Sequence, residues 1–219
     1  MTEKPEKIVG FEHVDTWVFD LDNTLYPPKV RLFDQIEERM TRFVMRELRV
    51  SRDTADKLRV EYFRAHGTTL AGLMEQHGID PDPYLIDVHD ISFDALQPDP
   101  NLAASIAALP GRKIIYTNGS APYAAQVAER RGLSGLFDAI YGVEHADYQP
   151  KPRRAAFEAV FARDGLHPGG AALFEDEARN LEQPHAMGMR TVHVAPAQSE
   201  MTYIDHHTED LAWFLQALM

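Results

Sequence analysis

The sequence predicts an α/β fold in which a doubly wound parallel sheet carries an inserted helical domain. Three observations predict it. Short apolar runs alternate with segments of helical periodicity from about residue 99 onward, which is the pattern of a parallel sheet with right-handed crossovers. Another apolar run, at 15–20, is separated from this alternation by a long stretch of helical pattern alone. The 219 residues suffice for one α/β domain and a small second one.

The run at 15–20 is predicted to be the first strand, and it ends in two carboxylates. Its aromatic and branched residues suit a strand that is covered on both faces. Asp20 and Asp22 come at its end, and open parallel sheets bind ligands beyond the carboxyl ends of their strands. Two buried carboxylates require a cation, a proton or basic neighbours. The alternative interpretation is an Asx turn through Asp22 and Asn23.

After Pro27-Pro28 the apolar residues follow a helical period. Residues 28–92 are therefore predicted to be the inserted domain, and residues 1–27 and 93–219 are predicted to form the α/β core. Four helices are expected in the inserted domain: one from Val30, one from an N-cap at Asp53 to Gly67, one from Thr68 or Thr69 to Gly78, and one opened by Asp80-Pro81. Its aromatic residues are expected to pack in its interior rather than to stack on a nucleobase: Phe33, Phe43, Tyr62 and Phe63.

The remaining elements follow from periodicity and from cap signals such as Asp99-Pro100. We expect strands at 113–116, 138–143, 171–174 and 190–195, and helices at 99–109, 122–131, 153–163, 179–187 and about 211–218. Glu177 and Arg179 are expected at the exposed start of a helix, and His206-His207 on the surface.

Composition excludes several classes of partner. The formal net charge is −12, from 34 acidic and 22 basic residues, so neither a nucleic acid duplex nor an anionic membrane is expected to bind. The absence of cysteine excludes disulfides and thiolate metal sites. Met1 to Gly10 lacks the apolar core of a secretory signal, and no apolar run approaches a membrane span. We therefore expect a cytoplasmic protein, either a monomer or a homodimer.

Polar residues stand at the end of a predicted strand or in a following loop at four places along the chain. They are Asp20 and Asp22, Thr117-Asn118, Lys151, and Glu175-Asp176. In this order and context they resemble the four motifs of the haloacid dehalogenase-like hydrolases, over Phe19 to Asn180. The resemblance implies a Rossmann-like core, with residues 28–92 as the helical cap. Within that cap, Tyr62 to Leu70 and His77 to Pro81 are similar to the pyrimidine 5′-nucleotidase branch.

The resemblance also implies a role for each motif residue in a phosphomonoesterase. Asp20 would be the nucleophile that forms an aspartyl-phosphate, and Asp22 would be the general acid and base. The phosphate would be bound by Thr117, Asn118 and Lys151. Mg²⁺ would be held by Asp20, Asp176 and the backbone carbonyl of Asp22, with Glu175 and Asn180 supporting these ligands. The substrate would be a small phosphorylated metabolite, and the cap favours a pyrimidine nucleoside 5′-monophosphate.

Other interpretations remain open at this stage. A dehalogenase on the same fold is disfavoured by Asp22, because a halide leaves without a proton. A non-catalytic binding protein would be expected to have lost Asp20 or Lys151, and both are present. A phosphatase or phosphomutase acting on a sugar phosphate or another small metabolite phosphate stays an alternative. Related nucleotidases commonly read Asp-Asp-Ser where this chain reads Glu175-Asp176-Glu177, which adds a charge beside the metal site. Lys151 alone could also be a solvated loop residue.

Overall fold

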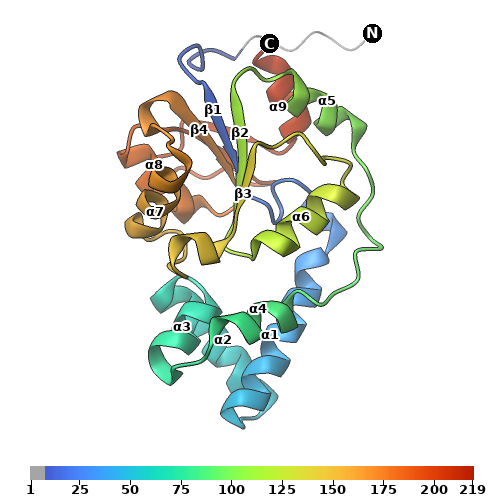
Figure 1. Cartoon of the computed structure of the whole chain (residues 1–219), viewed down its shortest axis with the longest axis vertical. Helices are drawn as coiled ribbons and strands as arrows, with labels where there is room; N and C mark the ends of the chain where they lie inside the picture. The colour runs from blue at the N-terminus through green and yellow to red at the C-terminus, as the bar shows by residue number, and fades with distance from the viewer. Residues whose placement is uncertain (1–7) are drawn as a thin grey trace.

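The computed structural model describes residues 8–219, and the first part of the expected N-terminal lead-in, residues 1–7, lies outside the described residues. Within residues 8–219 the chain forms a six-stranded parallel sheet in the order β3-β2-β1-β4-β5-β6 (Figure 1). The strands are β1 (Thr16–Phe19), β2 (Arg112–Tyr116), β3 (Ala139–Tyr141), β4 (Ala171–Glu175), β5 (Arg190–Val194) and β6 (His206–Thr208). The predicted doubly wound α/β fold is confirmed.

Helices cover both faces of the sheet. They are α5 (Pro100–Ala108), α6 (Ala121–Arg130), α7 (Arg154–Asp164), α8 (Glu182–Ala186) and α9 (Leu211–Ala217). Short 3-10 helices lie in the connections: η1 (Pro28–Val30), η2 (Val143–Ala146), η3 (Pro168–Gly170) and η4 (Ala178–Leu181). Figure 1 shows α5, α6 and α9 on one side and α7 and α8 on the other. Phe19 and Phe174 stack on the first side with ring centroids 4.9 Å apart, whereas Val18 packs with Phe157 of α7 on the second.

Two features of the core differ from the sequence prediction. The strand β6 was not predicted, because its residues His206, His207 and Thr208 carry no apolar pattern. Among the strands of residues 8–219 it pairs with β5 alone, at the edge of the sheet. The helix expected at 179–187 is divided into η4 and α8.

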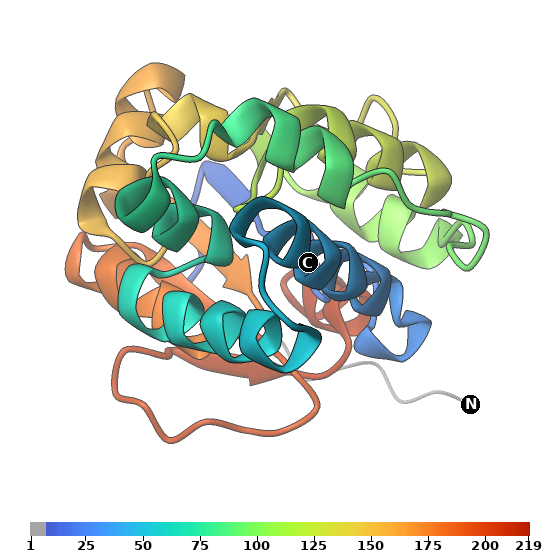
Figure 2. The ribbon, with the colours of Figure 1, turned by 90° about the horizontal axis from the view of Figure 1, so that it is seen from below.

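The helices α1 (Leu32–Leu48), α2 (Arg52–His66), α3 (Thr69–His77) and α4 (Pro81–Val88) form a separate helical layer. Viewed from below, this layer lies over one edge of the sheet (Figure 2). The close approach of α2 and α3 requires Gly72, because a Cβ there would lie 2.3 Å from the Tyr62 ring. The four helices fall within residues 28–92, and the exact domain boundaries stay a prediction.

Caps within the helical layer follow the sequence signals with one exception. Thr68 and Asp80 cap α3 and α4 through their side chains, as expected. The expected N-cap of α2 at Asp53 is wrong: Ser51 takes that position, because its hydroxyl accepts the Thr54 amide. Within residues 8–219, none of the helices combines the length and the hydropathy that a membrane crossing requires.

Candidate active site

All of the predicted site residues line one cavity of about 470 Å³ between the sheet and the helical layer. The cavity lies at the carboxyl ends of β1, β2 and β4. The strand order changes direction at β1: β2 and β3 lie on one side of it, and β4, β5 and β6 lie on the other. Such a switch in strand order opens a crevice where ligands bind in α/β sheets. The topology therefore brings together residues that are up to 160 positions apart, from Asp20 to Asn180.

Lys151 connects the two sides of this crevice. Its Nζ donates to Asp20 Oδ1 at 2.7 Å, to Glu175 Oε2 at 2.6 Å and to the carbonyl of Tyr116 at 3.0 Å. Only 1% of Lys151 is exposed, so the interpretation as a solvated loop lysine is wrong. A buried ammonium with three acceptors matches the full donor capacity of a lysine side chain.

The electrostatics of the site favour additional positive charge. Burial and the charge of Glu175 raise the pKa of Asp20 to about 7, although Lys151 opposes this shift. Burial, Asp20 and Glu175 raise the pKa of Asp176 to about 9. Burial alone would lower the pKa of Lys151, but attraction to Asp20 and Glu175 outweighs it and raises this pKa, so the lysine stays charged. One ammonium does not neutralise the surrounding carboxylates.

The carboxylates form a donor set that fits a hard divalent cation. One oxygen each from Asp20, Glu175 and Asp176 lie within 4.8 Å of one another, and carboxylate oxygens are the ligands that Mg²⁺ and Ca²⁺ prefer. Asn180, which lines the same cavity, has a buried Oδ1 that finds no hydrogen-bond partner among residues 8–219. Glu175 thus belongs to the cluster itself, while the Asp22 side chain lies outside it.

Asp176 is held by groups that sequence reasoning missed. Asn23 Nδ2 donates to Asp176 Oδ2 at 3.2 Å. His193 Nε2 lies 2.9 Å from the backbone carbonyl oxygen of Asp176. Asn23 has a φ of 61°, in the left-handed region that asparagine tolerates. The chain turns here because the Leu25 amide donates to the Leu21 carbonyl at 3.0 Å. Within residues 8–219 no backbone amide donates to the side chain of Asp22 or Asn23, so the alternative Asx turn does not form. Asn180 also bonds to the loop that carries Asp176, through its backbone amide, which donates to the Glu177 carbonyl at 2.9 Å.

Asp22 is bound by two tyrosines. The hydroxyls of Tyr26 and Tyr123 both donate to Asp22 Oδ1 at 2.6 Å. Burial raises the pKa of Asp22, while these two hydrogen bonds oppose the rise. Tyr26 follows Asp22 by one helical turn, a spacing that could have suggested the contact, whereas nothing near Tyr123 in the sequence signals it.

Thr117 and Asn118 are placed differently from each other. The Thr117 oxygen accepts the Gly119 amide at 2.9 Å, which leaves its hydroxyl hydrogen available to a ligand. Both ends of the Asn118 amide are committed to Lys151: Nδ2 donates to the Lys151 carbonyl at 3.1 Å, and Oδ1 accepts the Lys151 amide at 2.8 Å. The Asn118 side chain therefore fixes the backbone that carries the lysine.

The helical layer forms the apolar wall of the cavity. Side chains from α1, α2 and α4 line it: Phe33, Ile36, Met40, Val60, Phe63, Leu85 and Val88. The expectation that the four aromatic residues pack inside the layer is correct for Phe43 and Tyr62, which are buried. It is wrong for Phe63, which is 42% exposed and faces the cavity together with Phe33.

Arg179 ties this layer to the core and is not merely the exposed residue that was expected. Its guanidinium donates to the carbonyls of Phe63 and Gly67 at 3.0 Å each, and it lies 3.7 Å over the Phe63 ring. It thereby satisfies carbonyl groups at the end of α2. The end of α2 is held directly above the loop that carries Asp176.

The fold and the site together define an α/β protein with an aspartate at the end of its first strand and a helical layer over the crevice. The family model for haloacid dehalogenase-like hydrolases matches residues 14–188. This match covers most of the chain, and the protein belongs to that family.

One curated relative matches more than three quarters of the chain. The chain is 26% identical over 187 residues to Phosphate metabolism protein 8 of Saccharomyces cerevisiae, a match that covers 78% of this chain and 58% of the yeast protein. It thus spans a little over half the length of that curated relative.

Solved structures share the fold. The HAD-hydrolase YfnB from Bacillus subtilis, bound to magnesium, has a TM-score of 0.59 at 16% identity, covering 94% of this chain and 98% of that one. A HAD phosphatase from Thermococcus onnurineus has a TM-score of 0.58 at 16% identity, covering 89% and 93%. The L-2-haloacid dehalogenase from Xanthobacter autotrophicus, with chloropropionic acid covalently bound, has a TM-score of 0.52 at 16% identity, covering 85% and 80%.

Proposed function

We propose that this protein is a Mg²⁺-dependent phosphomonoesterase that acts through an aspartyl-phosphate on Asp20. The observation that carries the proposal is the arrangement of Asp20 and Asp22 in one cavity, with the Lys151 ammonium 2.7 Å from Asp20. Asp20 supplies a carboxylate nucleophile, Asp22 supplies a proton donor two residues away, and Lys151 supplies positive charge for the phosphoryl oxygens. The name of the yeast relative is consistent with phosphate chemistry.

The reaction has two steps at these side chains. In the first, an Asp20 oxygen bonds to phosphorus, the bond from phosphorus to the leaving oxygen breaks, and Asp22 gives its proton to that oxygen. In the second, Asp22 takes a proton from water as the water attacks phosphorus, which releases inorganic phosphate and restores Asp20. In both steps the Thr117 hydroxyl donates to a phosphoryl oxygen, and the positive charge of the Lys151 ammonium stabilises the negative charge on these oxygens.

The metal is assigned to the carboxylate cluster beside Lys151. Asp20, Asp176 and the backbone carbonyl of Asp22 would hold Mg²⁺, with Glu175 and Asn180 supporting these ligands. Bound there, the ion would neutralise charge on the phosphoryl group. The raised pKa values of Asp20 and Asp176 support this assignment, since the site favours more positive charge than Lys151 supplies.

Dehalogenases share this fold, but the site favours phosphate ester hydrolysis. A halide leaves as an anion and needs no acid, whereas an alkoxide needs a proton, and Asp22 is the group that would supply it. A phosphomutase uses the same groups and differs in its product. Measurement of free phosphate against an isomeric sugar phosphate separates these two reactions.

For the substrate we infer a pyrimidine nucleoside 5′-monophosphate. The cavity extends from the carboxylates to an apolar wall that includes Phe33 and Phe63, and Thr68 and Thr69, at the start of α3, also line it. An apolar wall with few polar groups suits a ring with a small number of hydrogen-bonding atoms. The inference requires that the space between the carboxylates and this wall accepts one ring and excludes two, so that a purine is rejected sterically.

The test is a phosphate-release screen of UMP, CMP, AMP, GMP and several sugar phosphates, with and without Mg²⁺. We expect Mg²⁺-dependent phosphate release, with kcat/KM higher for UMP and CMP than for the purine nucleotides. Equal kcat/KM values for AMP and UMP, or a large preference for a sugar phosphate, would refute the proposed nucleotide substrate but not the proposed phosphatase activity. No phosphate release from any substrate would refute both.

A further inference from the structure

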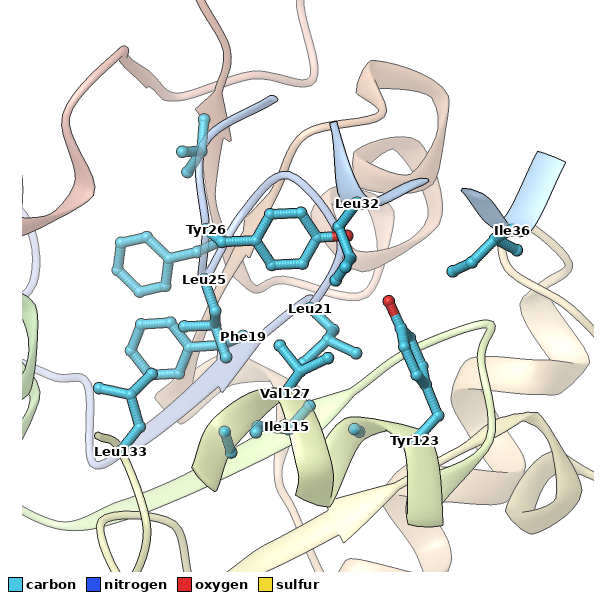
Figure 3. Packing of buried hydrophobic residues seen from close by; sticks show 14 of the residues in the cluster. Phe19, Leu21, Leu25, Tyr26, Leu32, Ile36, Ile115, Tyr123, Val127 and Leu133 are labelled. Atoms are coloured by element: carbon cyan, nitrogen blue, oxygen red, sulfur yellow. The ribbon is translucent and has the colours of Figure 1, made fainter. Parts of the chain in front are cut away.

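Two buried tyrosines donate to a single oxygen of Asp22. Tyr26 and Tyr123 are each 1% exposed, and their hydroxyls lie 2.6 Å from Asp22 Oδ1. Figure 3 shows the two hydroxyls directed toward the same region from different elements, Tyr26 from the turn after β1 and Tyr123 from α6. Within residues 8–219 both of these hydrogen bonds end on Oδ1, and no described residue donates to Oδ2.

We propose that Tyr26 and Tyr123 are positioning residues that turn Asp22 so that its catalytic proton is carried on Oδ2. The inference rests on the proposed role of Asp22 as general acid. A carboxylate oxygen has two lone-pair sites, and the tyrosines occupy both sites of Oδ1. The remaining oxygen is then the only one that can bind the proton, and its O–H bond is the one that breaks when the leaving oxygen takes that proton.

The surrounding packing holds the donors in place. The Tyr123 ring stacks on the His89 ring with a centroid distance of 4.3 Å and an interplanar angle of 6°. His89 directly follows α4, and its Nδ1 lies 3.1 Å from the hydroxyl of Ser120, the N-cap residue of α6. The Tyr123 ring therefore cannot turn without disturbing the point where the helical layer rejoins the core. Asp22 is oriented before substrate arrives, which is the condition for efficient proton transfer.

The experiment compares Tyr26→Phe and Tyr123→Phe on two substrates that differ in their need for an acid. An alkyl phosphate such as β-glycerophosphate requires protonation of its leaving oxygen, whereas p-nitrophenyl phosphate requires little. We expect each variant to lose about tenfold in kcat/KM on the alkyl ester, the scale of one hydrogen bond to a charged group, and less than about twofold on the aryl ester. Each variant tests the proposal separately, so one of them suffices if the other does not fold.

The matched control is Tyr141→Phe. It removes a tyrosine hydroxyl that donates to a different carboxylate, Asp164, at 2.9 Å and away from the cavity. We expect the control to leave the ratio of the two kcat/KM values unchanged.

A double-mutant cycle with Asp22→Asn separates positioning from a general structural role. If the tyrosines act only through the Asp22 proton, Tyr123→Phe should have no further effect, within about twofold, once Asp22 is asparagine. Equal losses on both substrates, no loss on either, or a loss that persists in the Asp22→Asn background would overturn the proposal. Asp22→Asn alone is the reference: if it does not distinguish the two substrates, the general-acid assignment itself fails, whatever the tyrosine variants do.

Discussion

Replacement of Lys151 by methionine should strongly destabilise the protein in the absence of metal. The ammonium is buried and is the shared partner of Asp20 and Glu175, at 2.7 and 2.6 Å. Methionine fills a similar volume without charge, so two carboxylates would remain buried with no counter-charge. Breaking a buried ion pair by removing one partner costs about 3–5 kcal/mol. We expect a loss of free energy of unfolding in this range at about pH 8.

Two dependences follow from the same geometry. The defect should be smaller at about pH 5, because the pKa of Asp20 is raised to about 7 and its carboxyl then holds a proton and needs no counter-charge. It should also be smaller in Mg²⁺ than in EDTA, because a cation bound to the same carboxylates replaces part of the missing charge. The assay is urea unfolding followed by circular dichroism, at both pH values and with either additive.

Lys113→Met is the control for loss of a lysine. Lys113 is partly exposed, and its Nζ donates to the carbonyls of Leu109 and Gly111 rather than to a carboxylate. We expect a loss of about 1 kcal/mol or less, without dependence on Mg²⁺. The reasoning would be refuted if Lys151→Met were as stable as the control in EDTA at about pH 8.

Three further predictions concern the carboxylates. Asp20→Asn should lower kcat by more than about a thousandfold with the fold intact; a steady-state assay that retains a tenth of the activity would contradict the covalent mechanism. EDTA should abolish activity, Mg²⁺ should restore it and Ca²⁺ should not, because Ca²⁺ accepts more ligands at longer distances and would let Asp20 bind through both oxygens; full activity in excess EDTA would exclude the metal. In EDTA, the free energy of unfolding of the wild type should fall relative to that of Asp176→Asn between about pH 5 and pH 8, by about 1.4 kcal/mol per pH unit. The reason is that the pKa of Asp176 is about 9 in the folded protein against an ordinary 3.8, so that unfolding releases a proton throughout this window. A difference in unfolding free energy that does not change with pH would contradict this.

The sequence by itself determined the order of the elements and the class of fold. Periodicity and caps are local properties, and Gly67, Thr68 and Asp80 end or begin helices through groups within a few residues of each. The polar residues at the strand ends could also be predicted to share one site, because parallel strands present their carboxyl ends at the same edge of a sheet.

Only the tertiary structure decided which of these side chains touch. Tyr123 and Asp22 are 101 residues apart, and Arg179 and Phe63 are 116 apart, yet each pair is in contact. The edge strand β6 depends on a neighbour rather than on its own residues. Phe63 belongs to an amphipathic helix, but whether its ring faces the interior of the layer or the cavity depends on how that layer sits over the sheet. Such contacts arise from packing between distant segments, and local sequence patterns carry no information about that packing.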